Sequence, residues 1–355
     1  MEEHSTPVYD GFSMPPEWHS HSGCLVSWPC KEDTWCGFSR KAKEAFSEAI
    51  KAISVFEPVI VLSDQSTVKE AREAVGKGVR TVEIPLDDAW IRDNGPVFVT
   101  SDEGEFAIVH FGFNGWGGRF PPYHNDARVP EILAERMRSR RYVAPMVLEG
   151  GAISVDGEGT LLTTESCLLN PNRNPGLSVE AIEDILKSYL GVRRILWLRQ
   201  GIHKSMVDGH IDGIAAFVRP STVVMATTDD EQDPNCEILR ANRMRLETMS
   251  DSKGRSIEVV DMPMPRCRAI SGSSIAPCYT NFFVAQGGIL VPTFGEANDK
   301  VATDILRGLF PDHEVVGVRS EYIGVGGGEI HCITQQIPKC ADRGLTLLLE
   351  ASRSE

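Results

Sequence analysis

The 355-residue sequence has no apolar run long enough to cross a lipid bilayer. Its first residues, MEEHSTPVYDGF, are acidic and polar, without the basic and apolar stretches of a secretory signal. We therefore expect a cytoplasmic protein with no membrane partner. The nine cysteines are scattered and odd in number, which predicts reduced thiols and no disulfide framework.

Several familiar motifs are also missing. There is no G-x-S-x-G serine-hydrolase elbow, no Walker A loop, no G-x-G-x-x-G before a helix, and no zinc-finger spacing of cysteines and histidines. These absences argue against the protein classes that the motifs define. A formal net charge of −14 disfavours nucleic acid and anionic lipid as partners and weakly attracts a small cation, although such acidity also serves solubility.

One pattern of elements recurs along the chain. Each repeat contains an amphipathic helix, an apolar strand, a polar loop with glycine, and a strand hairpin. The expected helices are Ser39–Phe56, Ser66–Val75, Asp126–Met137, Ser178–Gly191, Cys236–Met249 and Lys300–Phe310. The strands expected after them are Val59–Leu62, Val82–Ile84, Val143–Leu148, Arg194–Leu198, Ile257–Val260 and Val315–Val318.

Hairpins in every repeat favour a closed ring over an open parallel sheet. The lone strand Cys24–Pro29 stands before the first helix and could complete the last hairpin. We predict a five-bladed pseudosymmetric α/β propeller that forms a single domain over residues 1–355. Its core spans about 11–338, and the tail at 339–355 is either a short helix or partly disordered. Polar loops should converge on the axis at Asp93, Glu149, His210, about Asn281, and Cys332.

Cys332 ends the segment GGGEIHC, whose glycines let a ligand approach the chain and lead into an expected strand. A lone cysteine is more often a small buried hydrophobe, but the glycines weigh against that reading here. His210 and Asp212 lie two residues apart in GHID, so on an extended segment they share a face. A carboxylate beside an imidazole lets it act as acid and then as base, although a hydrogen-bonded surface histidine also explains the string.

Asp93 in WIRDNGP and Glu149 in LEGG precede expected strands, where acidic residues commonly stabilise turns. Trp116 in FNGWGG lies between glycines, so its ring could cover a planar cation or pack in the core. Gathered around one axis, these side chains would enclose a guanidinium, whose N–H groups pair bidentately with carboxylates. The carboxylates and histidine could also gather a metal, but a free cysteine among them suits covalent chemistry better.

The sequence resembles the agmatine deiminases, or agmatine iminohydrolases, of the guanidino-group-modifying superfamily with a five-bladed α/β propeller. The resemblance runs from MPPEW (Met14–Trp18) to ITQQIP (Ile333–Pro338), nearly the whole chain. It is carried by the segments MPPEW, WIRDNGP, FNGWGG, LEGGAISVDGEGTLLTTESCLLNPNRNP, GHID, TNFF and GGGEIHCITQQ.

The resemblance implies cysteine-dependent hydrolysis of agmatine to N-carbamoylputrescine and ammonia through a covalent thiouronium, on a route to putrescine and the polyamines. Cys332 would be the nucleophile, His210 the acid and base, and Glu149 its partner. It also implies a homodimer or larger homo-oligomer that uses no metal or organic cofactor. The implied substrate-binding residues are Asp93, Asp212, Trp90, Trp116, Asp88 and Gly328.

The chain departs from the family pattern at residues 203–206 (HKSM), at Gly213 and at Glu329. Acidic residues are lost before GHID and Lys204 is gained, which favours a neutral or carboxylated substrate tail over an ammonium; Arg119 could serve the same end. The alternatives are therefore a deiminase of another guanidino compound, such as an arginine derivative, or an amidinotransferase. A catalytically idle homologue is disfavoured by the intact set of chemical residues.

Overall fold

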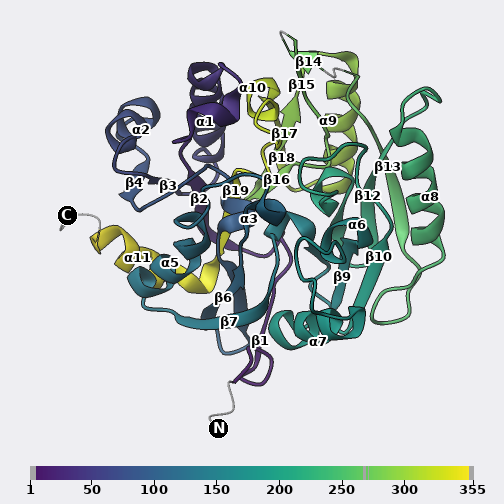
Figure 1. The fold of residues 1–355 in the computed structure, drawn as a ribbon, viewed down its shortest axis with the longest axis horizontal. Helices are drawn as coiled ribbons and strands as arrows, with labels where there is room; N and C mark the ends of the chain where they lie inside the picture. The colour runs from purple at the N-terminus through teal and green to yellow at the C-terminus, as the bar shows by residue number, and fades with distance from the viewer. Residues whose placement is uncertain (1–4, 267–268, 271, 352–355) are drawn as a thin grey trace.

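The computed structural model describes residues 5–266, 269–270 and 272–351 (Figure 1). Their strands form five sheets of three or four strands and a two-stranded ribbon of β14 (Ala269–Ile270) and β15 (Ser273–Ser274). Figure 1 shows these sheets around the middle of the molecule, where the short helix α3 (Ile91–Asn94) lies, with the longer helices toward the periphery. No helix among the described residues is long and apolar enough to cross a membrane.

One connection is repeated in all five larger sheets. An antiparallel hairpin is followed by a helix, and the strand after that helix pairs in parallel with the second hairpin strand. The repeats in the middle of the chain are β5 (Val97–Ser101), β6 (Phe106–Gly112), α5 (Val129–Met137) and β7 (Arg140–Val147); β8 (Ser154–Val155), β9 (Thr160–Thr164), α7 (Val179–Leu190) and β10 (Arg194–Leu198); β11 (Ala215–Arg219), β12 (Thr222–Thr227), α8 (Asn235–Glu247) and β13 (Glu258–Pro263); and β16 (Phe283–Ala285), β17 (Gly288–Thr293), α9 (Ala297–Leu309) and β18 (Glu314–Arg319).

The remaining sheet joins the two ends of the chain. Strand β19 (Thr334–Pro338) pairs antiparallel with β2 (His21–Ser27), which confirms that the lone N-terminal strand completes the last hairpin. Helix α1 (Ser39–Ile53), β3 (Val59–Ser63), α2 (Val68–Val75) and β4 (Arg80–Glu83) follow, with both strands added in parallel. The short β1 (Phe12–Ser13) pairs with β5. In the repeat expected from the sequence, the strand after each helix belongs with the hairpin that follows it. In the structure, that strand instead pairs with the hairpin that precedes the helix.

Local signals explain where several elements begin and end. The Ser178 hydroxyl accepts a hydrogen bond from the Ala181 N–H at 3.2 Å, and Gly191 ends α7 with a φ of 72°. Helix α9 begins before the expected Lys300 because Glu296 and Asp299 form a capping box. The other short helices are η1 (Glu32–Trp35), α4 (Gly115–Gly118), η2 (Asp126–Arg128), η3 (Gly150–Ala152), α6 (Glu165–Leu168), η4 (Ile211–Gly213), α10 (Glu321–Gly324) and η5 (Lys339–Ala341).

The core consists of apolar layers between neighbouring sheets and helices. Helix α1 buries Phe46 and Ile50 in a cluster that also holds Val61 and Leu290, strand residues of two different sheets. The C-terminal tail, whose form the sequence left open, contains helix α11 (Asp342–Ala351), which packs on α5. Leu345 and Leu348 of α11 are buried in one cluster with Leu133 and Met137 of α5, and this apolar contact stabilises the helix.

Candidate active site

Cys332 lies in a turn immediately before β19, so the expectation that it lies on a strand is wrong by two residues. Its Sγ accepts a hydrogen bond from Asn281 Nδ2 at 3.3 Å, and its backbone N–H donates to Asn281 Oδ1, also at 3.3 Å. The Sγ lies 3.5 Å from Asp212 Oδ2. Burial, followed by the negative charges of Asp212 and Asp93, raises the pKa of the Cys332 thiol well above its ordinary value. The resting side chain is therefore a neutral thiol.

Asp212 belongs to the 3-10 helix η4 and not to an extended segment, so the geometric argument made for GHID is wrong. Its Oδ2 lies 3.0 Å from Nδ1 of His331, whose Nε2 lies 2.6 Å from Oε1 of Glu17. Burial alone would raise the pKa of Asp212, but the hydrogen bond and charge of His331 hold it below its ordinary value. The carboxylates of Glu17 and Asp212 likewise outweigh burial and the charge of Arg92, and they raise the pKa of His331. His331 thus favours the ionised form of Asp212.

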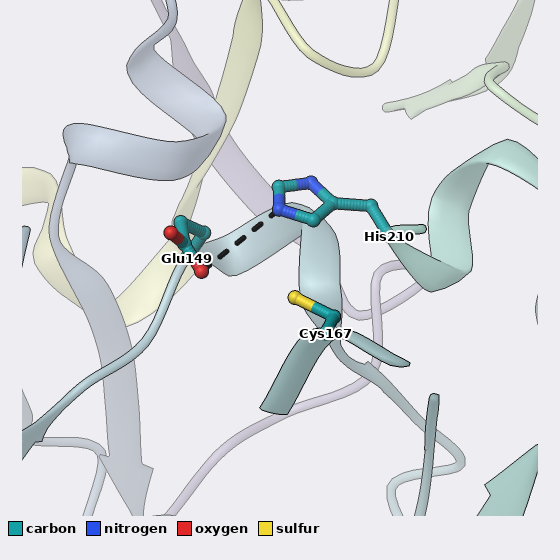
Figure 2. Close-up of side chains that lie close together, drawn as sticks. All are labelled: Glu149, Cys167 and His210. Atoms are coloured by element: carbon teal, nitrogen blue, oxygen red, sulfur yellow. Dashed lines mark ion pairs between the residues drawn. The ribbon is translucent and has the colours of Figure 1, made fainter. Parts of the chain in front are cut away.

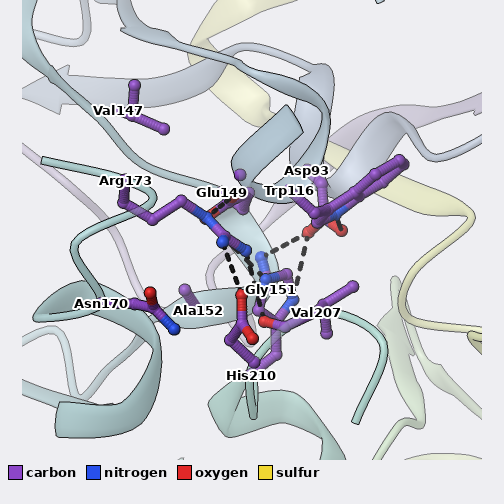
Figure 3. Close-up of polar contacts among 12 residues, drawn as sticks. Asp93, Trp116, Val147, Glu149, Gly151, Ala152, Asn170, Arg173, Val207 and His210 are labelled. Carbon is purple, nitrogen blue, oxygen red and sulfur yellow. Dashed lines mark hydrogen bonds and ion pairs between the residues drawn. The ribbon is translucent and has the colours of Figure 1, made fainter. Parts of the chain in front are cut away.

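Asp93 is held by the one-turn helix α3 and is buried. Its Oδ1 accepts from the backbone N–H of Gly151 at 3.0 Å, and its Oδ2 accepts from the indole N–H of Trp116 at 2.9 Å. Figure 3 shows the Trp116 ring reaching Asp93 from the opposite side to His210. Trp116 itself has a φ of 55°, which fixes the direction of its side chain. Both carboxylate oxygens are thereby oriented before any ligand arrives.

His210 caps η4, and its ring lies between two carboxylates. Its Nδ1 is 3.6 Å from Asp93 Oδ1, and its Nε2 is 3.9 Å from Glu149 Oε2 (Figures 2 and 3). Glu149 follows β7 and precedes η3, and it is completely buried. Burial raises the pKa of Glu149 above its ordinary value, although Arg173 opposes this effect.

Arg173 was missed by the sequence reasoning, although it lies in the quoted segment NPNRNP. Its Nε donates to Glu149 Oε1 at 2.6 Å, and its Nη1 donates to Asp208 Oδ2 at 2.7 Å and to Asn172 Oδ1 at 2.8 Å. The side chain is 0 % exposed, as is that of Glu149. A fully buried guanidinium thus fixes the carboxylate that faces His210 (Figure 3).

Gly151 explains how these groups come so close together. A Cβ built on it would lie 2.7 Å from His210 Nδ1 and 2.8 Å from both Asp212 Oδ2 and Asp93 Oδ1. Any side chain at this position would therefore push apart His210 and both carboxylates. Gly328 has the same role beside Cys332, since a Cβ there would lie 2.7 Å from Cys332 Cβ and 2.7 Å from Trp90.

One cavity of about 470 Å³ connects the predicted residues. The residues expected at the site that line it are Cys332, His210, Asp93, Asp212, Trp90, Trp116, Asp88 and Gly328. Glu149 alone of the expected residues lies behind this wall, in contact with His210. Burial raises the pKa of Asp88 to about 6, despite the hydrogen bond that its carboxylate accepts from Thr34 at 2.7 Å.

Several residues at which the chain departs from its family also line this cavity, among them Lys204, Met206, Gly213 and Glu329. Glu329 is buried, accepts a hydrogen bond from the Ser320 hydroxyl, and has its pKa raised well above its ordinary value by burial. Arg119 is not among the lining residues; it pairs with Asp208 and donates to the Met206 carbonyl at 2.9 Å.

The arrangement can perform nucleophilic chemistry on a planar cation. A thiol, two carboxylates and an imidazole face one cavity, and each is oriented by a buried partner. The cysteines of the described residues are free thiols; Cys267 lies outside the described residues. The described group that could hold a metal consists of Glu149, Cys167 and His210.

A family model described as Porphyromonas-type peptidyl-arginine deiminase matches residues 13–338. The agmatine deiminase of Pseudomonas aeruginosa (strain LESB58) is 44 % identical over 94 % of this chain and 97 % of that protein. The solved agmatine deiminase of Enterococcus faecalis is 37 % identical, covers 95 % of this chain and 98 % of its own, and superposes with a TM-score of 0.92. A C. jejuni agmatine deiminase with substrate bound is 27 % identical, with a TM-score of 0.84 over 92 % of this chain and 96 % of its own. The chain therefore belongs to the Porphyromonas-type peptidyl-arginine deiminase family, among the agmatine deiminases.

Proposed function

We propose that this protein hydrolyses the guanidino group of agmatine, giving N-carbamoylputrescine and ammonia through a covalent thiouronium on Cys332. The observation that carries the proposal is the placement of the Cys332 thiol, two carboxylates and His210 on the wall of one cavity. Relatives named agmatine deiminase, more than 40 % identical over nearly the whole chain, support the choice of substrate.

Asp93 and Asp212 bind the guanidinium. Their carboxylates accept hydrogen bonds from its N–H groups. The Trp116 indole N–H holds the Asp93 carboxylate in place, and His331 holds that of Asp212. The ring of Trp116 and the ring of Trp90 line the same cavity and provide apolar walls for the carbon chain. Asp88, which lines the same cavity, takes the distal ammonium, and this cation favours the ionised form of a carboxyl whose pKa is about 6.

Substrate charge activates the nucleophile. Because burial and two nearby carboxylates raise the pKa of the Cys332 thiol, it is protonated until a guanidinium lies between those carboxylates. The cation offsets their charge and lowers the pKa of the thiol, whose proton passes to His210, so that both carboxylates stay ionised against the guanidinium. The thiolate then attacks the guanidinium carbon.

His210 completes both halves of the reaction. It donates a proton to the departing nitrogen as the C–N bond breaks, so ammonia leaves and the thiouronium remains. It then accepts a proton from a water molecule, which attacks the same carbon, and cleavage of the C–S bond returns Cys332 and releases the ureido product. Glu149, 3.9 Å from His210 Nε2 and fixed by Arg173, stabilises the imidazolium between these steps.

A second candidate is hydrolysis of an arginine derivative with a neutral or carboxylated tail. Lys204 and Met206 in the cavity wall favour it, because neither side chain can pair with an ammonium. The chemical step would be the same, since the groups that contact the guanidinium do not change. Transfer of the amidino group to an amine in place of water is the remaining alternative and has no specific observation in its favour.

We also propose that the five larger sheets are the blades of a five-bladed α/β propeller forming one domain, supported by the connection that repeats in each of them. The homo-oligomeric state and the cytoplasmic location stay predictions. The mass of the purified protein in solution tests the first, and fractionation of cells tests the second.

The deciding experiment measures ammonia release together with the mass of the ureido product. The substrates are agmatine, arginine, an N-acylated arginine and guanidinobutyrate, and Cys332→Ala is the blank. Clear preference for agmatine with an inactive blank supports the proposal. Preference for a carboxylated or acylated guanidine supports the second candidate. If no substrate releases ammonia above the blank, hydrolysis is wrong and transfer to an amine acceptor is tested next.

A further inference from the structure

Three buried side chains form a cluster directly behind the cavity wall. Cys167, on helix α6, lies beside Glu149 and His210, and one donor atom from each lies within 4.8 Å of the other two. Figure 2 shows the thiol, carboxylate and imidazole converging on a common space. The reaction proposed above uses Glu149 and His210 and gives Cys167 no part.

Two atoms of this cluster lack hydrogen-bond partners. Glu149 Oε2 and His210 Nε2 are both buried and unpartnered among the described residues, and they face each other at 3.9 Å. Their residues are 0 % and 3 % exposed. A buried polar atom without a partner costs ~1–3 kcal/mol, so a ligand that satisfied both atoms would be favoured.

We propose that Glu149, Cys167 and His210 form an inhibitory site for a thiophilic divalent transition-metal ion such as Zn²⁺. One thiolate, one imidazole and one carboxylate are the three protein ligand types that zinc prefers, with a fourth position left for water. Tetrahedral zinc with bonds of ~2.0–2.3 Å needs donor atoms roughly 3.3–3.7 Å apart. Donors already within 4.8 Å of one another therefore have to close by only about 1 Å.

The contacts behind the ligands suit a metal as well. Glu149 binds Arg173 through Oε1 at 2.6 Å, which leaves Oε2 free to coordinate. His210 presents Nδ1 to Asp93 Oδ1 at 3.6 Å, so Nδ1–H can point to a carboxylate while Nε2 offers its lone pair. Metal-bound histidines and carboxylates are usually oriented by such outer partners.

The charges balance on binding. Cys167 releases one proton and becomes a thiolate, and together with the Glu149 carboxylate it neutralises the two positive charges of the ion. His210 stays neutral and contributes only its lone pair. Because Glu149 also pairs with Arg173, binding adds one net positive charge, which the Asp93 carboxylate, 3.6 Å from His210 Nδ1, offsets.

Metal binding and catalysis exclude each other. An ion on His210 Nε2 prevents the imidazole from becoming the imidazolium that the reaction needs and separates it from Glu149, but leaves Cys332 free. His210 lines the cavity, so the ion enters by the path that substrate uses, and bound substrate protects the site. This inhibition depends on the proposed deiminase function, whereas the binding of the metal does not.

The first measurement is Zn²⁺ binding to the full chain in competition with a chromophoric chelator, without substrate. Loss of a ligand should weaken binding at least about 100-fold, since loss of an outer partner alone costs ~10–100-fold. We expect one tight Zn²⁺ per chain in the wild type, in Cys332→Ala and in Cys278→Ala, a control that removes another buried cysteine of the cavity wall. Cys167→Ala should lose the tight Zn²⁺.

Cys167→Ser preserves the size of the side chain and guards against misfolding of the alanine variant. It should melt like the wild type and still lose the tight Zn²⁺, and Co²⁺ should lose its thiolate charge-transfer absorption. Retained tight binding in a folded Cys167 variant, or loss of binding in Cys332→Ala, would overturn the site. Inhibition of ammonia release, reversed by a chelator and absent in Cys167→Ser, tests its effect on catalysis; an enzyme without deiminase activity leaves the binding result intact.

Discussion

Replacing Arg173 by methionine tests whether the buried charge pair positions Glu149 against His210. The substitution removes the Nε–H that donates to Glu149 at 2.6 Å and the Nη1–H that donates to Asp208 at 2.7 Å. Glu149 Oε2 has no hydrogen-bond partner among the described residues, so both its oxygens would then be unpartnered in a fully buried position.

The expected loss of stability follows from that burial. Removing one partner of a buried ion pair typically costs ~3–5 kcal/mol, because the remaining charge stays out of water without compensation. We therefore expect Arg173→Met to lower the free energy of unfolding by about 3–5 kcal/mol. Arg243→Met is the matched control: Arg243 pairs with Glu247 and Asp261, which are 47 % and 57 % exposed, so its loss should cost less than about 1 kcal/mol.

A double substitution separates charge from packing. In Arg173→Met/Glu149→Gln the unpaired carboxylate is gone, so the double variant should be more stable than Arg173→Met alone by roughly 1–3 kcal/mol. Urea unfolding followed by tryptophan fluorescence measures all four proteins. Arg173→Met should also lower kcat at least about tenfold, because Glu149 no longer holds its position against His210. An Arg173→Met protein as stable as Arg243→Met, or a double variant no better than the single, would refute the reasoning.

Three further predictions concern single substitutions. Gly151→Ala should lower kcat/KM at least about 100-fold while the protein still folds, because a 1 Å displacement of reacting groups costs that much; Gly308→Ala, where an added Cβ meets nothing within 4 Å, is its control in the activity assay. His331→Gln should move the acid limb of the kcat/KM profile to higher pH, because Asp212 loses the cation that keeps its pKa low. Asp126→Asn should raise the free energy of unfolding more at pH 8 than at pH 5. Burial raises the pKa of Asp126 from 3.8 to about 7, so the cost of ionising this carboxyl in the folded state grows as the pH rises through that range.

The sequence predicted the helices and strands well where local signals mark both ends. Strand β10 has the predicted bounds, and α7 lies within one residue of them, because Ser178 and Gly191 provide a cap and a stop. The sequence could not predict which hairpin each later strand would join. Pairing depends on how the helix between two strands packs back on the sheet. An apolar strand has the same local pattern whichever hairpin it joins, so this pattern does not identify its partner.

The candidate site was predicted in its residues but not in its geometry. Glycine-rich segments identified Cys332 and His210, yet GHID forms a 3-10 turn in place of an extended segment. The charged partners Arg173, His331 and Glu17 were missed because a charged side chain in a polar segment is usually solvated. Only the fold buries Arg173 and His331 and places the partly exposed Glu17 beside His331, where these charges neutralise the site.

The buried ions of the site divide into pairs that leave one carboxylate exposed to a cation. Glu149 pairs with Arg173 at 2.6 Å, and Asp212 pairs with His331 at 3.0 Å. Among the described ion pairs, Asp93 has only the longer one to His210, at 3.6 Å. The protein itself therefore leaves an excess of negative charge at Asp93, on the wall of the cavity that Cys332 also lines.

This imbalance favours the substrate over the product. In the proposed mechanism, a guanidinium supplies the missing positive charge at Asp93 and offsets the carboxylate charges that raise the pKa of the Cys332 thiol, so binding and activation are coupled. The ureido group formed by hydrolysis is neutral. Once ammonia has left, the negative charge at Asp93 is therefore again without a compensating cation. Product binding is therefore weakened by the same carboxylates that bind the substrate, which couples the change of charge in the reaction to product release.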